Sequence, residues 1–479
     1  YYKSSDGVSA HSCIRKIKKE QGEQRMPKLF GTDGPRGIAV TDLTCELAMQ
    51  TGRAAAVVLA KKGGEKAKII IGKDTRASSD ALEAAVCAGV CSVGADAELV
   101  GVVPTPAVAF LVKEYGASAG IMISGSHNSA EFNGIKVFSS AGRKLTEDEE
   151  EKIEHLVMEA PHEIKLCPFE DVGRVNHDDK ALDAYIEHIE KAVGADLDGI
   201  RVALDCANGC AAYTAERIFS DLGADVTAIS VSPDGTNINK NCGSTNIQEL
   251  MDFVTDNGFD CGLAFDGDAD RCIAVDDTGD MIDGDKLMAI FMKAYKEKDL
   301  LDKNTAVVTA MSNHGLFRYA RENGITLETS GSGDRYILER MLEGGYKLGG
   351  EQSGHIIFLD DTSTGDGQLT GARLLSLMKE KKLKLSELAG EMHKLPQVIL
   401  NVRIPAESRE MWKNDREITD CIERQEQALG AEGRIIVRES GTEPIIRVMV
   451  EGSDFVAING MAVETATLIK HRCSLLNNN

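Results

Sequence analysis

The chain has 479 residues, of which 42% are hydrophobic and 27% are charged, and its formal net charge is −22 at pH 7. This length exceeds that of one ordinary core, and the balance of apolar and charged residues argues against wholesale disorder. So acidic a chain is a poor candidate for binding nucleic acid or an anionic membrane surface, and an anionic substrate would need positive charge concentrated at its site.

Residues 1–25 are polar and show neither the apolar segment of a secretory signal nor a strand or helix periodicity. We expect them to be an N-terminal extension outside the folded protein, with the natural start at Met26. No stretch of the sequence approaches the roughly 20 apolar residues that cross a bilayer. The twelve cysteines form no CxxC pair, so reduced thiols and a cytoplasmic location are the simplest interpretation.

From Met26 onward, three stretches repeat one pattern, in which an apolar strand is followed by a polar loop, an amphipathic helix and a second strand. Strands that alternate with helices in this way predict three similar α/β domains with mixed sheets. The predicted strands and helices, in chain order, are 68–72, 79–91, 201–205, 211–222, 225–230, 306–311, 314–323 and 326–330.

After Pro396 the pattern changes to a strand (VILNVRI), a charged helix over 414–428, two closely spaced strands (GRIIVRE and IIRVMVEG) and a final helix. This order predicts a smaller α+β domain at the C-terminal end of the chain. The domains are therefore expected at 26–178, 179–282, 283–394 and 395–479.

The motif FDGDADR, residues 265–271, carries the sharpest chemical signal. Asp266, Asp268 and Asp270 alternate, so their carboxylates can converge on one side of an extended or looped segment. Three carboxylates that close repel one another unless a cation neutralises them, and oxygen ligands favour a hard ion such as Mg²⁺. A calcium EF-hand does not fit, because Arg271 stands where its loop requires glycine. An aspartyl-nucleophile phosphatase centred on Asp266 remains an alternative.

The motif RESGTEPIIR, residues 438–447, gathers hydrogen-bond donors. Guanidinium groups, hydroxyls and an exposed backbone N–H all match the oxygens of a phosphate dianion, whereas the alternative is a plain turn between two strands. The donors are Arg438, Ser440, Gly441, Thr442 and Arg447.

Two glycine-rich loops give weaker signals. In GGEQSGH (349–355), the side chains of Glu351, Ser353 and His355 could bind sugar hydroxyls or an amine. In GTDGPRG (31–37), the glycines allow close backbone approach and Arg36 offers a cation. No P-loop is present and no GxGxxG follows a strand, which argues against ATP-driven and NAD-dependent chemistry.

The stretch ISGSHNSAEFNGIK, residues 123–136, places Ser126 beside His127. GSHNS is not the GxSxG elbow of hydrolases. With a metal site and a phosphate loop elsewhere, Ser126 instead suits a phosphoryl group: a phosphoserine carries close to −2 charge and would add an oxygen ligand to the ion, while Lys136 and Arg271 offset the remaining charge. A serine hydroxyl needs a base, and the sequence does not decide between His127 and Lys136.

These four motifs, in this order from Met26 nearly to the end of the chain, resemble the α-D-phosphohexomutase superfamily. The wording of GTDGPRG, GEQSGH, TGDGQ (364–368) and RESGTEPIIRVMVEG is most similar to the bacterial branch that acts on glucosamine phosphates. The branch acting on glucose and mannose phosphates more often reads GEMSGH. The resemblance implies three similar α/β domains and a C-terminal α+β domain around a central cleft. It also implies interconversion of glucosamine 6-phosphate and glucosamine 1-phosphate, which supplies UDP-N-acetylglucosamine and cell-wall synthesis.

Carried over residue by residue, the resemblance implies that Ser126 is the phosphoserine and that it binds one Mg²⁺ together with the three aspartates. A hexosamine 1,6-bisphosphate is the implied intermediate and activator, and a homodimer is an open expectation. The other implied roles are contacts with the sugar by Glu351 and Ser353, a grip on the non-transferring phosphate by Arg438, Ser440, Gly441, Thr442 and Arg447, and stabilisation of the travelling phosphoryl group by Arg36, Lys136 and Arg271.

The serine loop departs from the family pattern at two positions. The family typically has ASHNP around the serine, whereas this chain has Gly125 in place of the alanine and Ser129 in place of the proline. A glycine gained and a proline lost predict a looser loop, so activity is expected to survive while substrate preference and rate stay open. A glucose- or mannose-phosphate mutase is therefore the main alternative, and a non-catalytic sugar-phosphate sensor is another.

Overall fold

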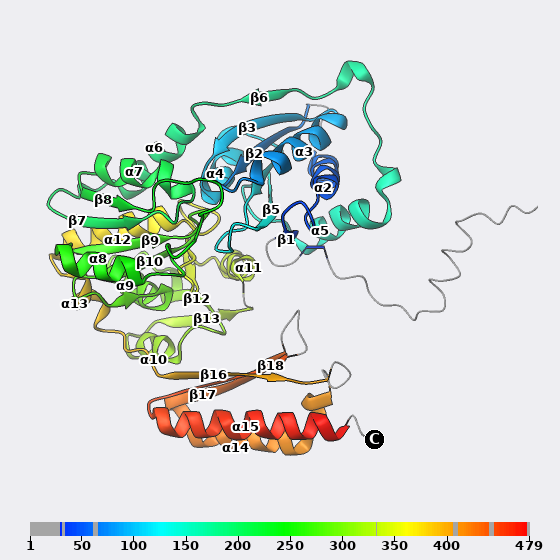
Figure 1. Cartoon of the computed structure of the whole chain (residues 1–479). Helices are drawn as coiled ribbons and strands as arrows, with labels where there is room; N and C mark the ends of the chain where they lie inside the picture. The colour runs from blue at the N-terminus through cyan, green and yellow to red at the C-terminus, as the bar shows by residue number, and fades with distance from the viewer. Residues whose placement is uncertain are drawn as a thin grey trace, which may run out of the picture.

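A computed structural model describes residues 29–30, 34–60, 66–331, 333–405, 411–439 and 445–476. Its strands form four sheets that follow one another along the chain (Figure 1). The expected extension 1–25 lies outside the described residues. Within the described ranges, no helix combines the length and the apolar character needed to span a membrane.

The first sheet has six strands and is covered by helices on both faces. Its elements are β1 (Arg36–Ile38), α2 (Cys45–Val58), β2 (Lys68–Lys73), α3 (Ser79–Ser92), β3 (Asp96–Val102), α4 (Thr105–Glu114), β4 (Ala119–Ile123), β5 (Phe132–Ser139), α5 (Glu147–Glu154) and β6 (Val175–His177). The strand order is β1-β5-β4-β2-β3-β6. Alternation along β2 sends Ile69 and Ile71 into one core with α2 and α3, and Ile70 into another with α4. This explains why the central strands read as continuous apolar runs.

The second sheet has five strands in the order β11-β10-β9-β7-β8. Its elements are α6 (Ala181–Val193), β7 (Arg201–Asp205), α7 (Ala215–Asp221), β8 (Asp225–Ile229), α8 (Gln248–Asn257), β9 (Cys261–Phe265), β10 (Cys272–Asp276) and β11 (Met281–Ile282). The helix predicted over 211–222 is divided, because a 3₁₀ turn at Cys210–Tyr213 precedes α7. The Cys210 N–H donates to the carbonyl of Gly267, so this turn serves a contact with the aspartate loop rather than the helix.

The third sheet has four strands in the order β13-β12-β14-β15. Its elements are α9 (Gly284–Glu297), β12 (Thr305–Thr309), α10 (His314–Glu322), β13 (Thr326–Ser330), α11 (Asp334–Gly344), β14 (Leu348–Gly350), β15 (Ile356–Phe358), α12 (Gly367–Lys381) and α13 (Leu385–Ala389). Helix α12 packs against α6 and against β9 and β10 of the second sheet. Its N-cap Asp366 accepts a hydrogen bond of 2.9 Å from the Tyr185 hydroxyl of α6. The largest apolar core consequently runs through all three of these sheets.

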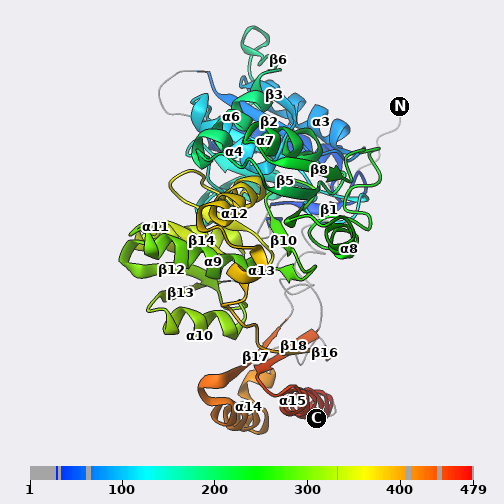
Figure 2. The ribbon, with the colours of Figure 1, turned by 90° about the vertical axis from the view of Figure 1, so that its left-hand side faces the viewer.

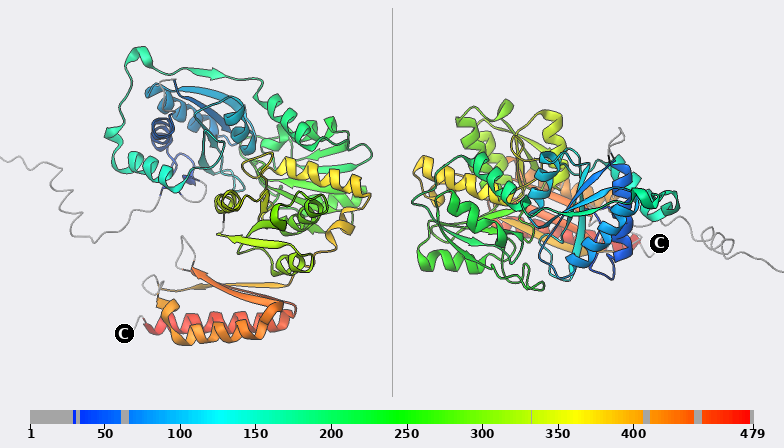
Figure 3. Two further views of the ribbon diagram at one scale, coloured as in Figure 1. Left: turned by 180° about the vertical axis from the view of Figure 1, so that it is seen from behind. Right: turned by 90° about the horizontal axis from the view of Figure 1, so that it is seen from above.

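The last sheet is small and antiparallel, in the order β16-β18-β17. Its elements are β16 (Gln397–Arg403), α14 (Arg416–Leu429), β17 (Gly433–Glu439), β18 (Ile445–Gly452) and α15 (Phe455–Leu476). One face packs on α14 and α15 around Val448 and Val450 and forms a separate core. Figure 2 and the left-hand view of Figure 3 show this unit lying apart from the three larger sheets. Three α/β units with mixed sheets and one small α+β unit confirm the predicted fold class.

Candidate active site

Three of the motif loops occupy the same place in three sheets. In each sheet, three parallel strands are followed by one that returns antiparallel: β5 beside β4, β10 beside β9 and β15 beside β14. Ser126 lies in the first of these turns, residues 266–271 form the second, and residues 351–355 form the third. Open α/β sheets bind ligands at the carboxyl ends of their parallel strands. The repeated topology therefore places the candidate site residues of these three loops where a ligand site is expected.

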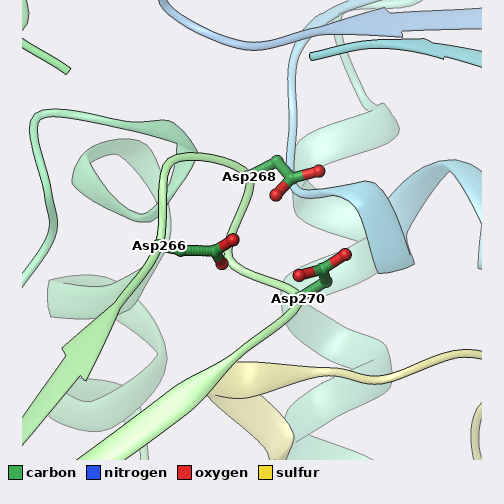
Figure 4. A group of neighbouring side chains, drawn as sticks. All are labelled: Asp266, Asp268 and Asp270. Carbon is green, nitrogen blue, oxygen red and sulfur yellow. The ribbon is translucent and has the colours of Figure 1, made fainter. Parts of the chain in front are cut away.

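The aspartates of the second loop form a group that could hold a metal ion. One carboxylate oxygen from each of Asp266, Asp268 and Asp270 lies within 4.8 Å of the others, and all three side chains are buried. Figure 4 shows them gathered around one small space. The loop folds tightly, since the Ala269 N–H donates to the Asp266 carbonyl. A Cβ at Gly267 would come within 2.7 Å of the Ser126 carbonyl oxygen, so the turn needs glycine there to approach the serine loop.

Ser126 and Lys136 complete this group from the first sheet. The Ser126 hydroxyl donates to Asp266 Oδ2 at 2.7 Å. Lys136 Nζ, on β5, lies 2.6 Å from Asp268 Oδ2 and 2.8 Å from Asp270 Oδ2. The structure therefore joins the serine loop and the aspartate loop into one buried centre.

The charges of this centre are not balanced by lysine alone. Burial, followed by the neighbouring Asp270 and Asp268, raises the pKa of Asp266 to about 8. Burial also acts to raise the pKa of Asp270, but Lys136 and the nearby His355 and Arg271 outweigh it and hold that pKa well below its usual range. Asp268 Oδ1 and Asp270 Oδ1 are buried and accept no hydrogen bond from a described residue. Buried oxygens of this kind fit a divalent cation, because its charge and coordination would satisfy them.

His127 faces the same centre from the serine loop. Its Nδ1 lies 3.4 Å from Ser126 Oγ. Burial, with smaller contributions from the guanidinium groups of Arg271 and Arg36, lowers the pKa of His127 to about 4. The imidazole is therefore neutral near pH 7, and both arginines that the sequence singled out lie close enough to influence it.

The third loop reaches the centre through His355. This imidazole is 2% exposed. Its Nε2 accepts a hydrogen bond from the Gly365 N–H at 2.9 Å, and its Nδ1 lies 3.9 Å from Asp270 Oδ1. Glu351 and Ser353 stay partly exposed and bond to each other at 2.6 Å. Glu351 and Ser353 are thus better placed than His355 to meet a ligand.

The C-terminal sheet presents two arginines on the face turned away from its helices. Arg438 of β17 and Arg447 of β18 are directly paired across the strands. They line a cavity of about 250 Å³ together with Met311, Ile399, Asn401, Ile436 and Met449. Ser440, Gly441 and Thr442, which the sequence places in the same phosphate loop, lie outside the described residues.

Sequence reasoning missed three residues that contact the centre. The hydroxyl of Thr105 donates to Asp268 Oδ2, and its N–H donates to the Asp268 carbonyl. Arg76 and Asn239 donate to backbone carbonyls of the serine loop. Their position in the sequence could have indicated them, because they follow the strands β2, β3 and β8. The carboxyl ends of these strands are at the same edge of the sheets as the motif loops.

Comparison with known proteins places this arrangement in a family. Family models described as phosphoglucomutase/phosphomannomutase α/β/α domains I, II and III match residues 27–163, 183–279 and 283–395, and the model of the C-terminal domain matches 399–468. The chain belongs to the phosphoglucomutase/phosphomannomutase family.

Curated relatives match over nearly the whole chain. A phosphoglucosamine mutase of Clostridium acetobutylicum is 50% identical over 449 residues, which covers 94% of this chain and 100% of the relative. One of Caldicellulosiruptor bescii is 50% identical over 455 residues, with the same shares covered.

Solved structures share the fold at lower identity. A Burkholderia thailandensis phosphoglucomutase/phosphomannomutase family protein has a TM-score of 0.77 at 23% identity, over 92% of this chain and 97% of that one. An Aspergillus fumigatus N-acetylphosphoglucosamine mutase, solved in complex with GlcNAc-6P and magnesium, has a TM-score of 0.64 at 17% identity, over 98% of this chain and 100% of that one.

Proposed function

We propose that this chain is a phosphoglucosamine mutase, which interconverts glucosamine 6-phosphate and glucosamine 1-phosphate and so supplies UDP-N-acetylglucosamine for cell-wall synthesis. The choice of substrate is supported by the relatives of this name that are 50% identical along their full length. The chemistry is supported above all by one contact, the 2.7 Å hydrogen bond from Ser126 to Asp266 inside a buried group of three carboxylates.

One Mg²⁺ is the ion proposed for Asp266, Asp268 and Asp270, with Ser126 as a further oxygen ligand. The all-oxygen donor set and the two buried carboxylate oxygens without a hydrogen bond support it. Bound there, the ion would supply positive charge to offset that of a phosphoryl group on the serine.

In the proposed reaction, phospho-Ser126 gives its phosphoryl group to the free hydroxyl of the bound sugar phosphate. The P–O bond to Ser126 Oγ breaks, and a P–O bond to the sugar oxygen forms. The sugar hydroxyl loses its proton to a base, and Ser126 Oγ takes up a proton to become the free hydroxyl. The resulting hexosamine 1,6-bisphosphate turns end for end and returns its other phosphate to Ser126. Of the two candidate bases, His127 fits better, because its imidazole is neutral near pH 7 whereas Lys136 is held in two ion pairs.

Positioning and charge stabilisation account for most of the rate in phosphoryl transfer. Arg36, Lys136 and Arg271 are proposed to stabilise the travelling group, and Glu351 and Ser353 to bind the sugar. His355 is proposed to orient Asp270 from its buried place rather than to touch the sugar, which revises the contact with substrate expected from the sequence.

The phosphate that is not transferred is proposed to bind Arg438 and Arg447, together with Ser440, Gly441 and Thr442. Like charges directly opposite one another on paired strands are destabilising, so the arginine pair on β17 and β18 suits an anion between its members.

We also propose the domain boundaries 26–178, 179–282, 283–394 and 395–479. They are supported by the position of each boundary between two successive sheets. A homodimer and a cytoplasmic location stay predictions, and size-exclusion chromatography with light scattering would test the first.

The decisive experiment measures the intact mass of the purified protein before and after phosphatase treatment and maps the modified peptide. Phosphate on Ser126, with loss of mutase activity in Ser126→Ala, is the expected result. Phosphate on Asp266 would instead favour the aspartyl phosphatase. Coupled assays with glucosamine, glucose and mannose phosphates rank the substrates, and a strong preference for glucose or mannose would overturn the proposed one.

A further inference from the structure

The backbone of Ser126 is held in an unfavourable conformation. Its φ is +51°, in the left-handed region that costs an L-residue roughly 1–2 kcal/mol. Its side chain is 1% exposed and turned toward Asp266. Strain of this kind persists only where the surrounding structure fixes it, so the contacts of the loop backbone must do so.

Arg76 supplies the largest set of those contacts. One of its guanidinium nitrogens donates to the carbonyls of Ser126 at 2.9 Å and Asn128 at 2.8 Å, and the other donates to the carbonyl of Ser129. The guanidinium is fully buried, and its Nε donates to Asp74 Oδ2 at 2.9 Å. Because Asp74 neutralises its charge nearby, Arg76 can bind the loop without competing for the carboxylates of the metal site.

Asp74 links this contact to the other side of the loop. Its carboxylate accepts a hydrogen bond of 2.7 Å from the Ser124 hydroxyl. The oxygen of that hydroxyl, Ser124 Oγ, in turn accepts a hydrogen bond of 2.9 Å from the Ser126 N–H. The N–H and the carbonyl of Ser126 are therefore both anchored, directly or through one intermediate, to the pair Asp74–Arg76.

The second sheet contributes a matching donor. Asn239 Nδ2 donates to the same two carbonyls that Arg76 binds, at 2.8 Å to Ser126 and 2.9 Å to Asn128. Asn239 follows β8, so the serine loop is fixed from both of the units that build the metal site.

Gly125 leaves room for the guanidinium. A Cβ at this position would lie 2.9 Å from Arg76 Cζ and 3.0 Å from one of its terminal nitrogens. Those atoms are the end of a flexible side chain, but their hydrogen bonds hold them in place. The glycine that sequence reasoning took for a source of looseness lets Arg76 close on the loop.

We propose that Arg76, assisted by Asn239, is a positioning residue that keeps Ser126 aimed at the metal site in both its free and its phosphorylated form. The proposal rests on the proposed function and adds a reason for these contacts. When Ser126 accepts a phosphoryl group, its hydroxyl proton is lost and the hydrogen bond to Asp266 goes with it. The contacts of Arg76 and Asn239 are to backbone carbonyls, so they do not change between the two forms and keep the serine in reach for the return transfer.

The test compares Arg76→Lys with the wild-type enzyme and with Arg321→Lys, an exposed arginine near the end of α10 that serves as a matched control. Lysine keeps the charge beside Asp74 but cannot reach three carbonyls. The expected result is a fall in kcat of about 10²-fold, the size that a 1 Å misplacement of a reacting group causes, with KM for the sugar phosphate changed by less than about threefold. The backbone amides of residues 125–129 are expected to exchange hydrogen much faster than in the wild type.

Asn239→Ala serves as a second variant in case Arg76→Lys folds poorly. It is expected to shift the same two readouts in the same direction by a smaller factor, with the melting temperature near that of the wild type. Wild-type kcat together with wild-type exchange in both variants would overturn the proposal. So would a loss of activity that only follows the fraction of unfolded protein.

The exchange measurement needs no turnover. If the wild-type protein lacks mutase activity, the proposed function fails, while the exchange rates of residues 125–129 still show whether Arg76 holds the loop. If the wild type is active and these rates do not respond to Arg76→Lys, the positioning role alone fails.

Discussion

The two places where the proposed reaction would hold phosphate are built in opposite ways. Around Ser126, residues from the first and second sheets interlock: Lys136 pairs with Asp268 and Asp270, and Asn239 reaches into the serine loop. Each of these side chains is nine-tenths or more buried. Such a centre is suited to fixing one geometry.

The arginines of the C-terminal sheet belong to a unit that is joined to the rest of the described residues near one end of the sheet. Glu451, fully buried, accepts from Asn313 Nδ2 at 3.2 Å, and Arg434 donates to it and to the carbonyl of Ala310. Arg438 lies four residues further along β17 from Arg434 and faces a cavity rather than a packed neighbour. In the proposed reaction, the buried centre around Ser126 would transfer one phosphate and the C-terminal sheet would bind the other. This division suits a substrate that presents either of its ends.

The largest expected effect comes from a substitution in the buried centre formed by Ser126, Lys136 and the three aspartates. Asp268→Asn removes one charge that pairs with Lys136 and a carboxylate oxygen of the metal group. We expect kcat to fall at least about 10³-fold, because charge stabilisation dominates this chemistry. Calorimetric titration should show that Mg²⁺ binding is lost. Asp256→Asn, on the exposed face of α8, is the control, and a variant of Asp268 that kept a tenth of the wild-type kcat would contradict the assigned role.

The attachment of the C-terminal unit should show itself in the pH dependence of stability. Burial, followed by the charge of Asp283, raises the pKa of Asp285 to about 7. Asp285 accepts the N–H of Asn313, the residue that binds Glu451. A raised carboxyl pKa contributes stability that is full below pH 4 and is lost as the pH rises through 7.

Asp285→Asn keeps the acceptor and removes the charge. Its stability relative to the wild type should therefore rise between pH 4 and pH 7 and level off above, by on the order of 4 kcal/mol in all. Denaturation midpoints between pH 4 and pH 8 measure this. Asp299→Asn, which is exposed, should show no such trend, and a flat difference for Asp285→Asn would refute the argument.

The substitution Arg447→Met tests the proposed phosphate binding by the C-terminal sheet. Removing one of two cations that face the same cavity should raise KM for the sugar phosphate about 30-fold, since a charged hydrogen bond contributes about 2 kcal/mol, while kcat falls much less. Steady-state kinetics separate the two terms. Arg424→Met, at an exposed position of α14, provides the comparison. An unchanged KM in Arg447→Met would show that Arg447 does not hold phosphate.

These contrasts also explain what the sequence could and could not predict. Asp266, Asp268 and Asp270 carry their chemistry in their own side chains and spacing, so their convergence was predictable. The contact between Ser126 and Asp266 joins residues 140 positions apart, and only the chemistry of a phosphoryl group and the resemblance to a family connected them.

Arg76, Thr105 and Asn239 escaped prediction because their contacts depend on the topology of the sheets. Each is a common residue in a loop. Thr105 and Asn239 bond to partners in another unit, and Arg76 bonds to backbone carbonyls about 50 residues further along its own unit. Helix α12 gives the same lesson at the level of the fold, since it follows the third sheet in the chain but packs on the second. Periodicity predicts that a helix buries one face, yet it does not say against which sheet.

The smallest expected effect concerns backbone strain at Val40, which is compared with the strain at Ser126. Val40 has a φ of +69° and is 53% exposed, a genuine outlier for a β-branched residue. Its N–H donates to the Leu43 carbonyl at 3.0 Å. Among the described residues, no buried guanidinium binds this backbone as Arg76 binds that of Ser126. Asparagine tolerates the left-handed region, so Val40→Asn should raise the free energy of unfolding by about 1 kcal/mol and leave kcat unchanged. Val57→Asn, exposed on α2 with ordinary helical geometry, should stay within about 0.5 kcal/mol of the wild type. A loss of stability in Val40→Asn would mean that packing of the valine side chain holds this backbone in place. The strained backbones of Val40 and Ser126 would then both be held by their surroundings, and the contrast drawn between them would fail.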